Sequence, residues 1–411
     1  MKTALTFLLA ISCSATCLAQ NDADEPVVRF ATFNVSLNRR NAGDLLDDLK
    51  KGNDQAHRVA EIIQRVRPDV ILLNEFDYDK DGNALSYFKT HYLRVPHGQA
   101  EPIEYAFHYT GPVNTGVPSG RDLDKNGKST DAADAYGFGY FPGQYGMVVL
   151  SRFPFDQKKV RTFQKFLWKD MPNADLPVDP ASGKPYYSDE DMPHLRLSSK
   201  SHWDLPVLIG NRVTHFLVSH PTPPAFDGPE KRNGCRNHDE IRFWADYVSP
   251  KKSGYIYDDK GGKGGLKPNA TFIVAGDQNA DPNDGASRDH AIQQLLRHPL
   301  IKDRQPAGEG GPLQAKSDGK VNLKHKGDPR FDTSNFSDRV VGNLRVDYVL
   351  PSKSLRKGRA GIFWPAPGKP EAELANCSDH RLVWIDLGYS EDDQMEMKRA
   401  KDAGEPAGAG R

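Results

Sequence analysis

The stretch Thr271-Phe272-Ile273-Val274-Ala275-Gly276-Asp277-Gln278-Asn279 decides the fold class of this chain. Its first five residues are an apolar run that predicts a buried β-strand. The strand passes directly into a turn that carries a carboxylate and an amide. In α/β proteins, ligands bind beside the carboxyl ends of the strands. Asp and Asn are also ordinary turn formers, so this turn gains meaning only if other strands end in the same way.

Several further segments predict strands and helices around this one. Val27–Phe33 and Val70–Leu73 are apolar runs, and between them the apolar residues of His57–Arg67 recur at helical spacing. This pattern is typical of a strand-helix-strand unit. A helix is also expected after Asn237, with Glu240 placed as in a capping box. The remaining expected elements are strands at Met147–Leu150, Val207–Ile209, Val213–Val218, Leu344–Leu350 and Leu382–Leu387, and a helix at Arg288–Arg297.

The amino terminus predicts export. Lys2, the apolar run from Ala4 to Ile11 and the small residues that follow identify residues 1–19 as a cleavable signal peptide. The run is shorter than the roughly 20 apolar residues of a transmembrane helix, and no later segment is apolar enough to cross a membrane. Lipid attachment at Cys13 or Cys17 is the alternative, but the residues before each cysteine fit it poorly. We therefore expect a secreted or periplasmic protein.

Composition limits the classes of partner. The 411 residues are 37% apolar and 27% charged, which is enough for a sizeable core. The 55 basic and 55 acidic residues give a net charge of zero, whereas a protein that holds a nucleic-acid backbone usually carries a positive excess. Charge therefore does not indicate nucleic acid as the partner. After cleavage Cys235 and Cys377 remain, and they can form one disulfide or stay as two buried thiols.

Long polar stretches separate the predicted elements. Such loops are uncommon inside a compact domain and tend to be functional, so we expect surface insertions that form the rim of a site. Residues 390–411 lack apolar periodicity and predict a disordered tail. The stretches lie near residues 96–143, 169–204, 249–269 and 303–340.

Polar side chains recur at the ends of the predicted strands. Each one alone has an ordinary explanation as a turn or cap residue, but their recurrence favours one shared site. Carboxylate and amide oxygens suit Mg²⁺ or Mn²⁺. A histidine paired with a carboxylate can take a proton from water, and further donors can stabilise charge on phosphate oxygens. The residues are Asn34, Glu75, His220, Asp277, Asn279, Asp379 and His380, with Asp347 inside the strand predicted at Leu344–Leu350.

In order along the chain, these residues and their neighbours resemble the endonuclease/exonuclease/phosphatase superfamily, whose members include deoxyribonuclease I-like nucleases, phosphatases and sphingomyelinases. The resemblance spans about residues 27–388 and points to a secreted bacterial-type member with large insertions. It implies an α+β fold, a four-layer α/β/β/α sandwich in which two mixed sheets pack face to face with helices outside. It also implies a single catalytic domain over residues 20–389. The matching motifs are Thr32-Phe33-Asn34, Pro68 to Glu75, Val149 to Pro154, Ser219-His220, Gly276 to Asn279, Arg345 to Leu350 and Ser378 to Arg381.

The same resemblance implies roles for these residues. Asn34, Glu75 and Asp379 would hold the metal, which we expect to be Mg²⁺ or Mn²⁺. His380 with Asp347 would be the general-base pair. Asp277 and Asn279 would position the nucleophile and the phosphate, and His220 would polarise the phosphate.

Two weaker signals concern ligands outside this set. Asp122, Asp124 and Asn126 follow the start of a calcium loop, which Asp131 or Asp134 could complete, and Asp77 to Gly82 has a similar start. Both are also compatible with Asx-rich turns. A second group of cations and a histidine, in two loops, could contact the substrate phosphate or could be solvated. This group comprises Arg196, Lys200, His202, Arg232 and Arg236.

The function predicted from the sequence is therefore an exported, divalent-metal-dependent phosphoesterase that acts as a monomer on phosphodiesters or phosphomonoesters. A dinuclear metallophosphatase would need further His and Asp ligands that the chain lacks. The alternative from another class is a secreted, calcium-stabilised binding module with a relic site. The sequence does not distinguish a nuclease, a phosphatase and a sphingomyelinase-like enzyme.

Overall fold

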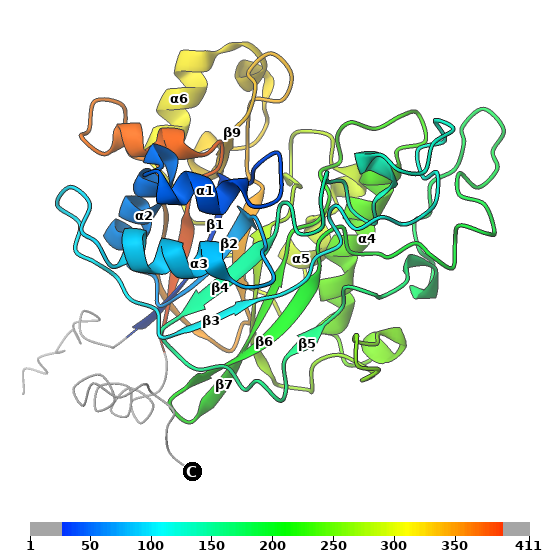
Figure 1. Ribbon diagram of the computed structural model, residues 1–411, viewed down its shortest axis with the longest axis horizontal. Helices are drawn as coiled ribbons and strands as arrows, with labels where there is room; N and C mark the ends of the chain where they lie inside the picture. The colour runs from blue at the N-terminus through cyan, green and yellow to red at the C-terminus, as the bar shows by residue number, and fades with distance from the viewer. Residues whose placement is uncertain (1–26, 389–411) are drawn as a thin grey trace, which may run out of the picture.

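The computed structural model describes residues 27–388, so the expected signal peptide and tail lie outside the described residues. Two β-sheets form the centre of the molecule (Figure 1). The first sheet consists of β1 (Val27–Leu37), β2 (Val70–Phe76), β3 (Phe107–Thr110), β4 (Met147–Ser151), β12 (Arg356–Ile362) and β13 (Val383–Gly388). The second consists of β5 (Arg161–Thr162), β6 (His202–Ile209), β7 (Arg212–Ser219), β8 (Thr271–Asp277) and β11 (Asp347–Pro351).

Both sheets are mixed. The strand order is β12-β13-β1-β2-β4-β3 in the first sheet and β11-β8-β7-β6-β5 in the second. β1 runs parallel to β2, and β7 runs parallel to β8. The other neighbouring strands are antiparallel. The two parallel pairs place the carboxyl ends of β1, β2, β7 and β8 at one end of the sandwich, which we call the polar edge.

Helices cover the outer faces of the sheets. No helix among residues 27–388 is long and apolar enough to span a membrane. The helices are α1 (Asp44–Lys50), α2 (Asp54–Val66), α3 (Asn83–Phe88), α4 (Arg232–Tyr247), α5 (Gln293–Leu296) and α6 (Gly310–Asp318), and a π-helical turn η1 (Lys89–Leu93) extends α3. Short 3₁₀ turns are η2 (Ala132–Asp134), η3 (Trp168–Asp170), η4 (Ser253–Tyr255), η5 (Arg288–His290), η6 (Lys320–Lys324), η7 (Pro329–Phe331) and η8 (Ala372–Cys377).

Three hydrophobic clusters define four layers. The inner faces of the two sheets share one cluster, in which the rings of Phe30 and Phe216 lie 5.5 Å apart. The outer face of the first sheet packs against α1, α2 and α3, and the outer face of the second packs against α4 and α5. The predicted α/β/β/α sandwich is confirmed.

Local chemistry explains where the elements begin and end. The Asn53 side chain accepts the Ala56 N–H and starts α2, and Arg67 ends the helix in the left-handed conformation. The helix predicted at Arg288–Arg297 is wrong in its first half, because Asp289 and His290 have positive φ. α4 begins five residues before the predicted start at Asn237, directly after Lys231.

The strand predicted at Leu344–Leu350 is broken. Its first part pairs as β10 (Asn343–Leu344) with β9 (Ser334–Asn335), and its second part is β11. The break occurs because the Thr333 hydroxyl accepts the backbone N–H groups of Val346 and Asp347. A side chain distant in sequence therefore replaces a strand neighbour at this point.

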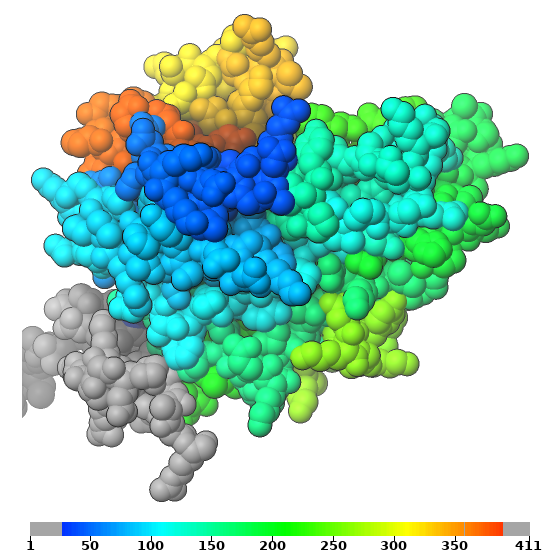
Figure 2. All heavy atoms as spheres, viewed as in Figure 1, coloured from blue at the N-terminus to red at the C-terminus, as the bar shows by residue number. Residues whose placement is uncertain are grey.

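The stretch near residues 303–340 is only partly a surface insertion. Most of it forms the yellow lobe in Figure 2. Its end, however, enters the core, where Ser334 forms a β-bridge with His380. The Asn335 N–H donates to the Asp379 carbonyl, and the Arg381 N–H donates to the Thr333 carbonyl, each at 2.7 Å. This segment therefore serves as the backbone partner of the Asp379–Arg381 turn.

Asp332, directly before Thr333, is a buried residue with other carboxylates nearby. It is 7% exposed. Burial, followed by the negative charges of Asp281, Asp284 and Asp328, raises the pKa of Asp332 to about 7. Between pH 4 and pH 7 the folded state therefore keeps a proton that the unfolded state releases, and this group lowers stability as pH rises through that window.

We expect Asp332→Asn to abolish this pH dependence. The variant should match the wild type near pH 4.5 and exceed its free energy of unfolding near pH 8 by on the order of 2 to 4 kcal/mol. Urea denaturation in EDTA at several pH values measures the difference. Asp189→Asn is the matched control, because this carboxylate is exposed and is not among the charges that act on Asp332. A difference that is constant with pH would contradict the prediction.

Candidate active site

The side chain of Asp277 is the centre of the polar edge. Its Oδ2 lies 3.2 Å from Asn34 Nδ2, 3.3 Å from His220 Nε2 and 3.6 Å from His380 Nε2. Glu75 joins the same group, with Oε1 3.1 Å from Asn34 Nδ2. The residues that the sequence placed at separate strand ends therefore meet around one carboxylate.

Gly276 makes this convergence sterically feasible. Its φ is +140°, in a region that residues with a Cβ rarely adopt. A Cβ at this position would lie 2.0 Å from the Ser219 carbonyl oxygen. The absence of a side chain thus lets β8 approach the end of β7 closely enough for Asp277 and His220 to touch.

His380 and Asp347 form a buried pair. His380 Nδ1 lies 2.9 Å from Asp347 Oδ2, and both residues are at most 5% exposed. The Ser378 hydroxyl accepts the His380 N–H, and the Phe336 ring packs edge-on against the imidazole with centroids 5.3 Å apart. With Nδ1 engaged, Nε2 faces Asp277 and the polar edge.

The carboxylates control the charge of His380. Burial alone would lower its pKa, but the negative charges of Asp347 and Asp277 outweigh burial and raise the pKa of His380 well above its usual range. Burial likewise opposes ionisation of Asp277, yet His380 and then His220 hold the pKa of Asp277 far below its usual range. Burial raises the pKa of Asp347 to about 6. His380 is therefore an imidazolium in the metal-free protein.

His220 has the opposite environment. Complete burial and, next, the nearby charge of Lys200 lower its pKa. Its Nδ1 is buried and has no hydrogen-bond partner among the described residues. A neutral imidazole at this place can donate one hydrogen bond without adding charge.

The remaining predicted residues line the same edge. Ser36 links Asp379 to Asn34. The Ser36 hydroxyl lies 3.3 Å from Asp379 Oδ1, and the Ser36 N–H donates to Asn34 Oδ1 at 3.2 Å. Asn279 has a φ of +52°, and its side chain donates to the Pro221 carbonyl at 3.0 Å. Its backbone N–H donates to Asp277 Oδ1 at 2.8 Å.

The donor set fits a divalent cation. Among the described residues, the ion-pair contacts of Glu75 and Asp379 are to imidazoles, each at 4.0 Å. Their side chains are 21% and 52% exposed, so both can reach a bound ion from solvent. Hard carboxylate oxygens, together with the amide of Asn34, are the ligands that Mg²⁺ and Mn²⁺ prefer. Asp277, Asp347 and His380 also bring ligand atoms within 4.8 Å of one another.

Four of the five residues expected to contact substrate instead hold the fold together. Arg236, on the first turns of α4, is partly buried and donates to the backbone carbonyls of four residues. His202 contacts the Ser198 hydroxyl and the Glu240 carbonyl, and burial lowers its pKa to about 4. Arg196 donates to Asn114, and Arg232 donates to the Leu123 carbonyl. Protein acceptors already engage these four side chains, so their contact with substrate stays a prediction.

Lys200 is the exception in that group. It is 7% exposed. The carboxylates whose negative charges act most strongly on its ammonium are Glu240, Glu75 and Asp277, in that order. Two of these belong to the polar edge. Lys200 therefore lies where a substrate contact is feasible.

Of the two alternatives that the sequence left open for the cysteines, the structure has two buried thiols and no disulfide between them. Cys235 and Cys377 are free thiols. Cys235 packs with the helices outside the second sheet and Cys377 with those outside the first, so the two layers of sheet separate them. Burial raises the pKa of each thiol to about 12, which leaves both unreactive at neutral pH.

The second of the two candidate calcium loops keeps its acidic cluster. Ligand atoms of Asp122, Asp124 and Asp134 lie within 4.8 Å of one another, and the Asn126 N–H donates to Asp122. In the first loop the Asp77 carboxylate instead accepts the Arg39 and Tyr145 N–H groups. Asp79 there caps α3 through Asn83.

Three supporting residues escaped the sequence analysis. The Thr333 hydroxyl accepts the backbone N–H of Asp347. The Asn74 side chain accepts the Asp277 N–H at 3.3 Å. Glu240, expected as a helix cap, is instead a buried carboxylate whose oxygens accept the N–H groups of Ser199 and Thr222. Only the position of Asn74, one residue before Glu75 at a strand end, carried a sequence signal.

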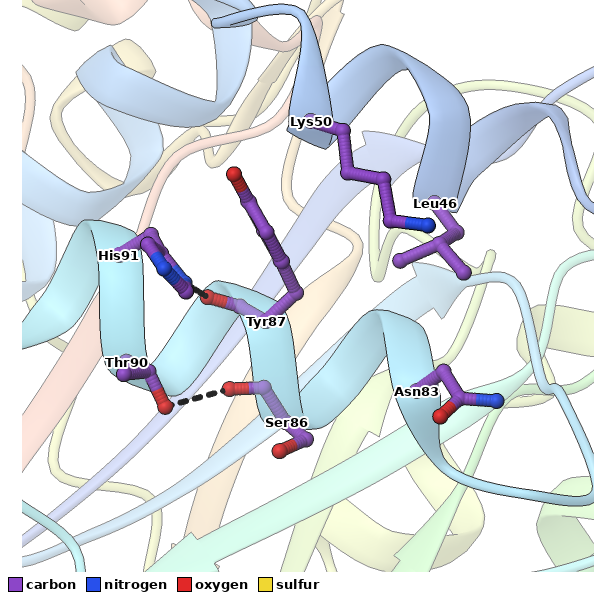
Figure 3. Close-up of a pocket in the computed structure, with 7 residues that line it drawn as sticks. All are labelled: Leu46, Lys50, Asn83, Ser86, Tyr87, Thr90 and His91. Carbon is purple, nitrogen blue, oxygen red and sulfur yellow. Dashed lines mark hydrogen bonds between the residues drawn. The ribbon is translucent and has the colours of Figure 1, made fainter.

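A surface hollow lies away from the polar edge. It is formed by α1 and by the helical segment of α3 and η1, and it has a volume of about 400 Å³. In Figure 3, Lys50 and Leu46 extend from α1 toward Tyr87 on the opposite helix. The groups of the polar edge do not line this hollow.

Comparison with protein families identifies the chain. The Endonuclease/Exonuclease/phosphatase family profile matches residues 31–380, from β1 to His380. The chain belongs to this family. The protein is therefore a hydrolase of phosphate ester bonds, and it belongs to a family of metal-dependent phosphoesterases. No protein of curated function matches the sequence significantly.

Three solved structures are among those similar to this chain. The endonuclease/exonuclease/phosphatase from Beutenbergia cavernae is 18% identical, with 89% of this chain and 72% of that chain covered and a TM-score of 0.46. TDP2 from C. elegans is 15% identical, with coverages of 88% and 75% and a TM-score of 0.43. Beta toxin from Staphylococcus aureus is 13% identical, with coverages of 89% and 100% and a TM-score of 0.41.

The pair formed by His380 and Asp347 can be tested directly. We expect Asp347→Asn to lower the pKa of His380 by about one to three pH units in the metal-free protein, because the nearest stabilising negative charge is removed. NMR titration of the imidazole Hε1 resonance measures this pKa. The exposed His91 serves as an internal reference. An unchanged His380 pKa would contradict the assigned electrostatic coupling.

Proposed function

We propose that this protein is an exported, divalent-metal-dependent phosphoesterase in which His380, oriented by Asp347, accepts the proton of the attacking water. The observation that carries the proposal is the 2.9 Å contact between His380 Nδ1 and Asp347 Oδ2, which leaves Nε2 facing the polar edge. Export rests on the signal-peptide pattern of residues 1–19.

In the proposed reaction each side chain of the polar edge has one role. A water oxygen forms a bond to phosphorus, its proton passes to His380 Nε2, and the bond from phosphorus to the leaving-group oxygen breaks. Asp277 and Asn279 orient the water and the phosphate. His220 donates a hydrogen bond to the charge that develops on the phosphate oxygens.

The metal ligands in this proposal are Glu75, Asp379 and Asn34. A bound Mg²⁺ or Mn²⁺ would neutralise phosphate charge and would favour the basic form of the nearby imidazole. Without a metal, Asp347 and Asp277 raise the pKa of His380 well above its usual range, so the proposal requires the bound metal to favour the neutral imidazole that can act as a base.

The substrate class remains broad in this proposal. The net charge of zero does not favour a protein that follows a nucleic-acid backbone. A panel of plasmid DNA, bis-p-nitrophenyl phosphate, p-nitrophenyl phosphate, sphingomyelin and sugar phosphates would distinguish diesters from monoesters and lipids from nucleic acids.

We expect EDTA to abolish hydrolysis of bis-p-nitrophenyl phosphate and Mg²⁺ or Mn²⁺ to restore it. Glu75→Ala and His380→Ala should each lower kcat/KM by about a hundredfold or more, because one removes a metal ligand and the other the base. The control is His290→Ala, on the exposed turn η5. Thermal melting of every variant separates loss of chemistry from loss of fold.

Full activity of either variant would overturn the assignment. The acidic cluster of Asp122, Asp124 and Asp134 supports the alternative of a calcium-stabilised binding module. That alternative predicts a calcium-dependent rise in Tm and no turnover of any phosphate ester.

A further inference from the structure

One buried cation of the polar edge has no role in the proposed reaction. Lys200 lies in the loop before β6 and is 7% exposed. Among the described residues, no carboxylate lies within 4.0 Å of its ammonium to form an ion pair, and no hydrogen bond from that group is found. The Lys200 nitrogen is not among the fully buried atoms without a partner, so the stem is buried while the ammonium keeps contact with solvent.

The Ser199 hydroxyl lies 3.2 Å from the His220 carbonyl, so the backbone that carries Lys200 lies beside the polar edge. Glu240, Glu75 and Asp277 attract the Lys200 ammonium, in that order, and Arg236 repels it. The charge of Lys200 also lowers the pKa of His220. His220 Nε2 is 3.3 Å from Asp277 Oδ2. Lys200 therefore shares the region in which His220, Glu75 and Asp277 face the substrate.

The backbone around Lys200 is held rigidly. Its carbonyl accepts the Asn114 N–H at 2.8 Å. The neighbouring Ser199 hydroxyl lies 3.0 Å from Glu240 and 3.2 Å from the His220 carbonyl. The other Glu240 oxygen accepts the Thr222 N–H at 2.7 Å.

Glu240 thereby joins the loop before β6 to the loop after β7. These two strands pair from His202 with Ser219 to Ile209 with Arg212. In Figure 1 their hairpin turn lies at the foot of the molecule, so both loops lie at the opposite end of the hairpin. Glu240 is a positioning residue that keeps Lys200 beside His220.

Close packing over the loop leaves little freedom for a different arrangement. A Cβ on Gly137 would lie 1.9 Å from the Ser199 carbonyl oxygen. The backbone at Gly137 is therefore in direct contact with the residue that precedes Lys200. The ammonium has three donors, and a phosphate oxygen is an acceptor that the polar edge is built to receive. A buried cation with unused donors in a phosphate site is suited to bind that oxygen.

We propose that the Lys200 ammonium binds a non-bridging oxygen of the substrate phosphate, beside His220. The proposal rests on the proposed function of the same site and adds a substrate contact that is independent of the metal ligands and of the base. The competing explanation is that Lys200 only fills space or balances Glu240.

Lys200→Met distinguishes these explanations, because methionine retains an unbranched apolar stem and removes the charge. We expect the dissociation constant for inorganic phosphate, measured by calorimetry on the full mature chain loaded with Mn²⁺, to rise about ten- to a hundredfold. KM for bis-p-nitrophenyl phosphate should rise in parallel. The denaturation midpoint should stay equal, because methionine keeps the buried apolar stem and no hydrogen bond or ion pair of the ammonium with the described residues is lost.

Lys200→Ala provides a second variant, in which added ethylammonium should restore part of the lost phosphate affinity. Lys169→Met is the matched control, because Lys169 is an exposed lysine that pairs with Asp170 at 2.6 Å. Unchanged phosphate affinity in Lys200→Met overturns the proposal, as does absence of phosphate binding by the wild type. A lower denaturation midpoint with unchanged affinity supports the space-filling explanation.

The two proposals fail separately in this experiment. If the wild type binds phosphate through Lys200 but hydrolyses none of the esters, the phosphoesterase assignment falls and the phosphate contact stands. If the wild type hydrolyses the diester and Lys200→Met behaves identically, only the Lys200 contact falls.

Discussion

The ionised carboxylate of Asp277 is the interaction on which the polar edge depends. One oxygen, Oδ2, is within 3.6 Å of Asn34, His220 and His380. These three residues come from β1, from the end of β7 and from the turn before β13. A buried carboxylate is stable only when donors and positive charge surround it, so the two sheets must meet at this point. The close approach of β8 at Gly276 is the backbone counterpart of the same requirement.

The polar edge carries more negative than positive charge. Glu75, Asp277, Asp347 and Asp379 face the imidazolium of His380 and the ammonium of Lys200. Net negative charge in a partly buried site favours uptake of a cation, and polar groups held against their preference for water lower the stability of the fold. The same imbalance that opposes folding therefore prepares the site for a divalent metal and an anionic substrate.

The sequence predicted the elements whose signal is local. Apolar runs located β1, β2, β4 and β8, and polar residues at the ends of β1, β2 and β8 marked the edge. It failed where a distant side chain intervenes, as when Thr333 interrupts the strand predicted at Leu344–Leu350. It also assigned Arg236 and His202 to substrate because residue type alone does not reveal that backbone carbonyls already accept from them. The position of Glu240 in a helix suggested a cap, whereas its burial beneath two loops is a tertiary property.

The bridge between Ser334 and His380 divides the 303–340 segment into two parts with different freedom to change. The lobe that contains α6 is joined to β12 and Trp364 at its start, where the Ala307 carbonyl accepts the Ile362 N–H and the Gly310 N–H donates to the Trp364 carbonyl. The last residues, from Thr333 to Phe336, form the backbone partner and the aromatic wall of the His380 imidazole. A change between these two attachments leaves the surroundings of the imidazole intact, whereas a change within Thr333–Phe336 does not. The boundary between adaptable and fixed structure lies inside the loop and not at its ends.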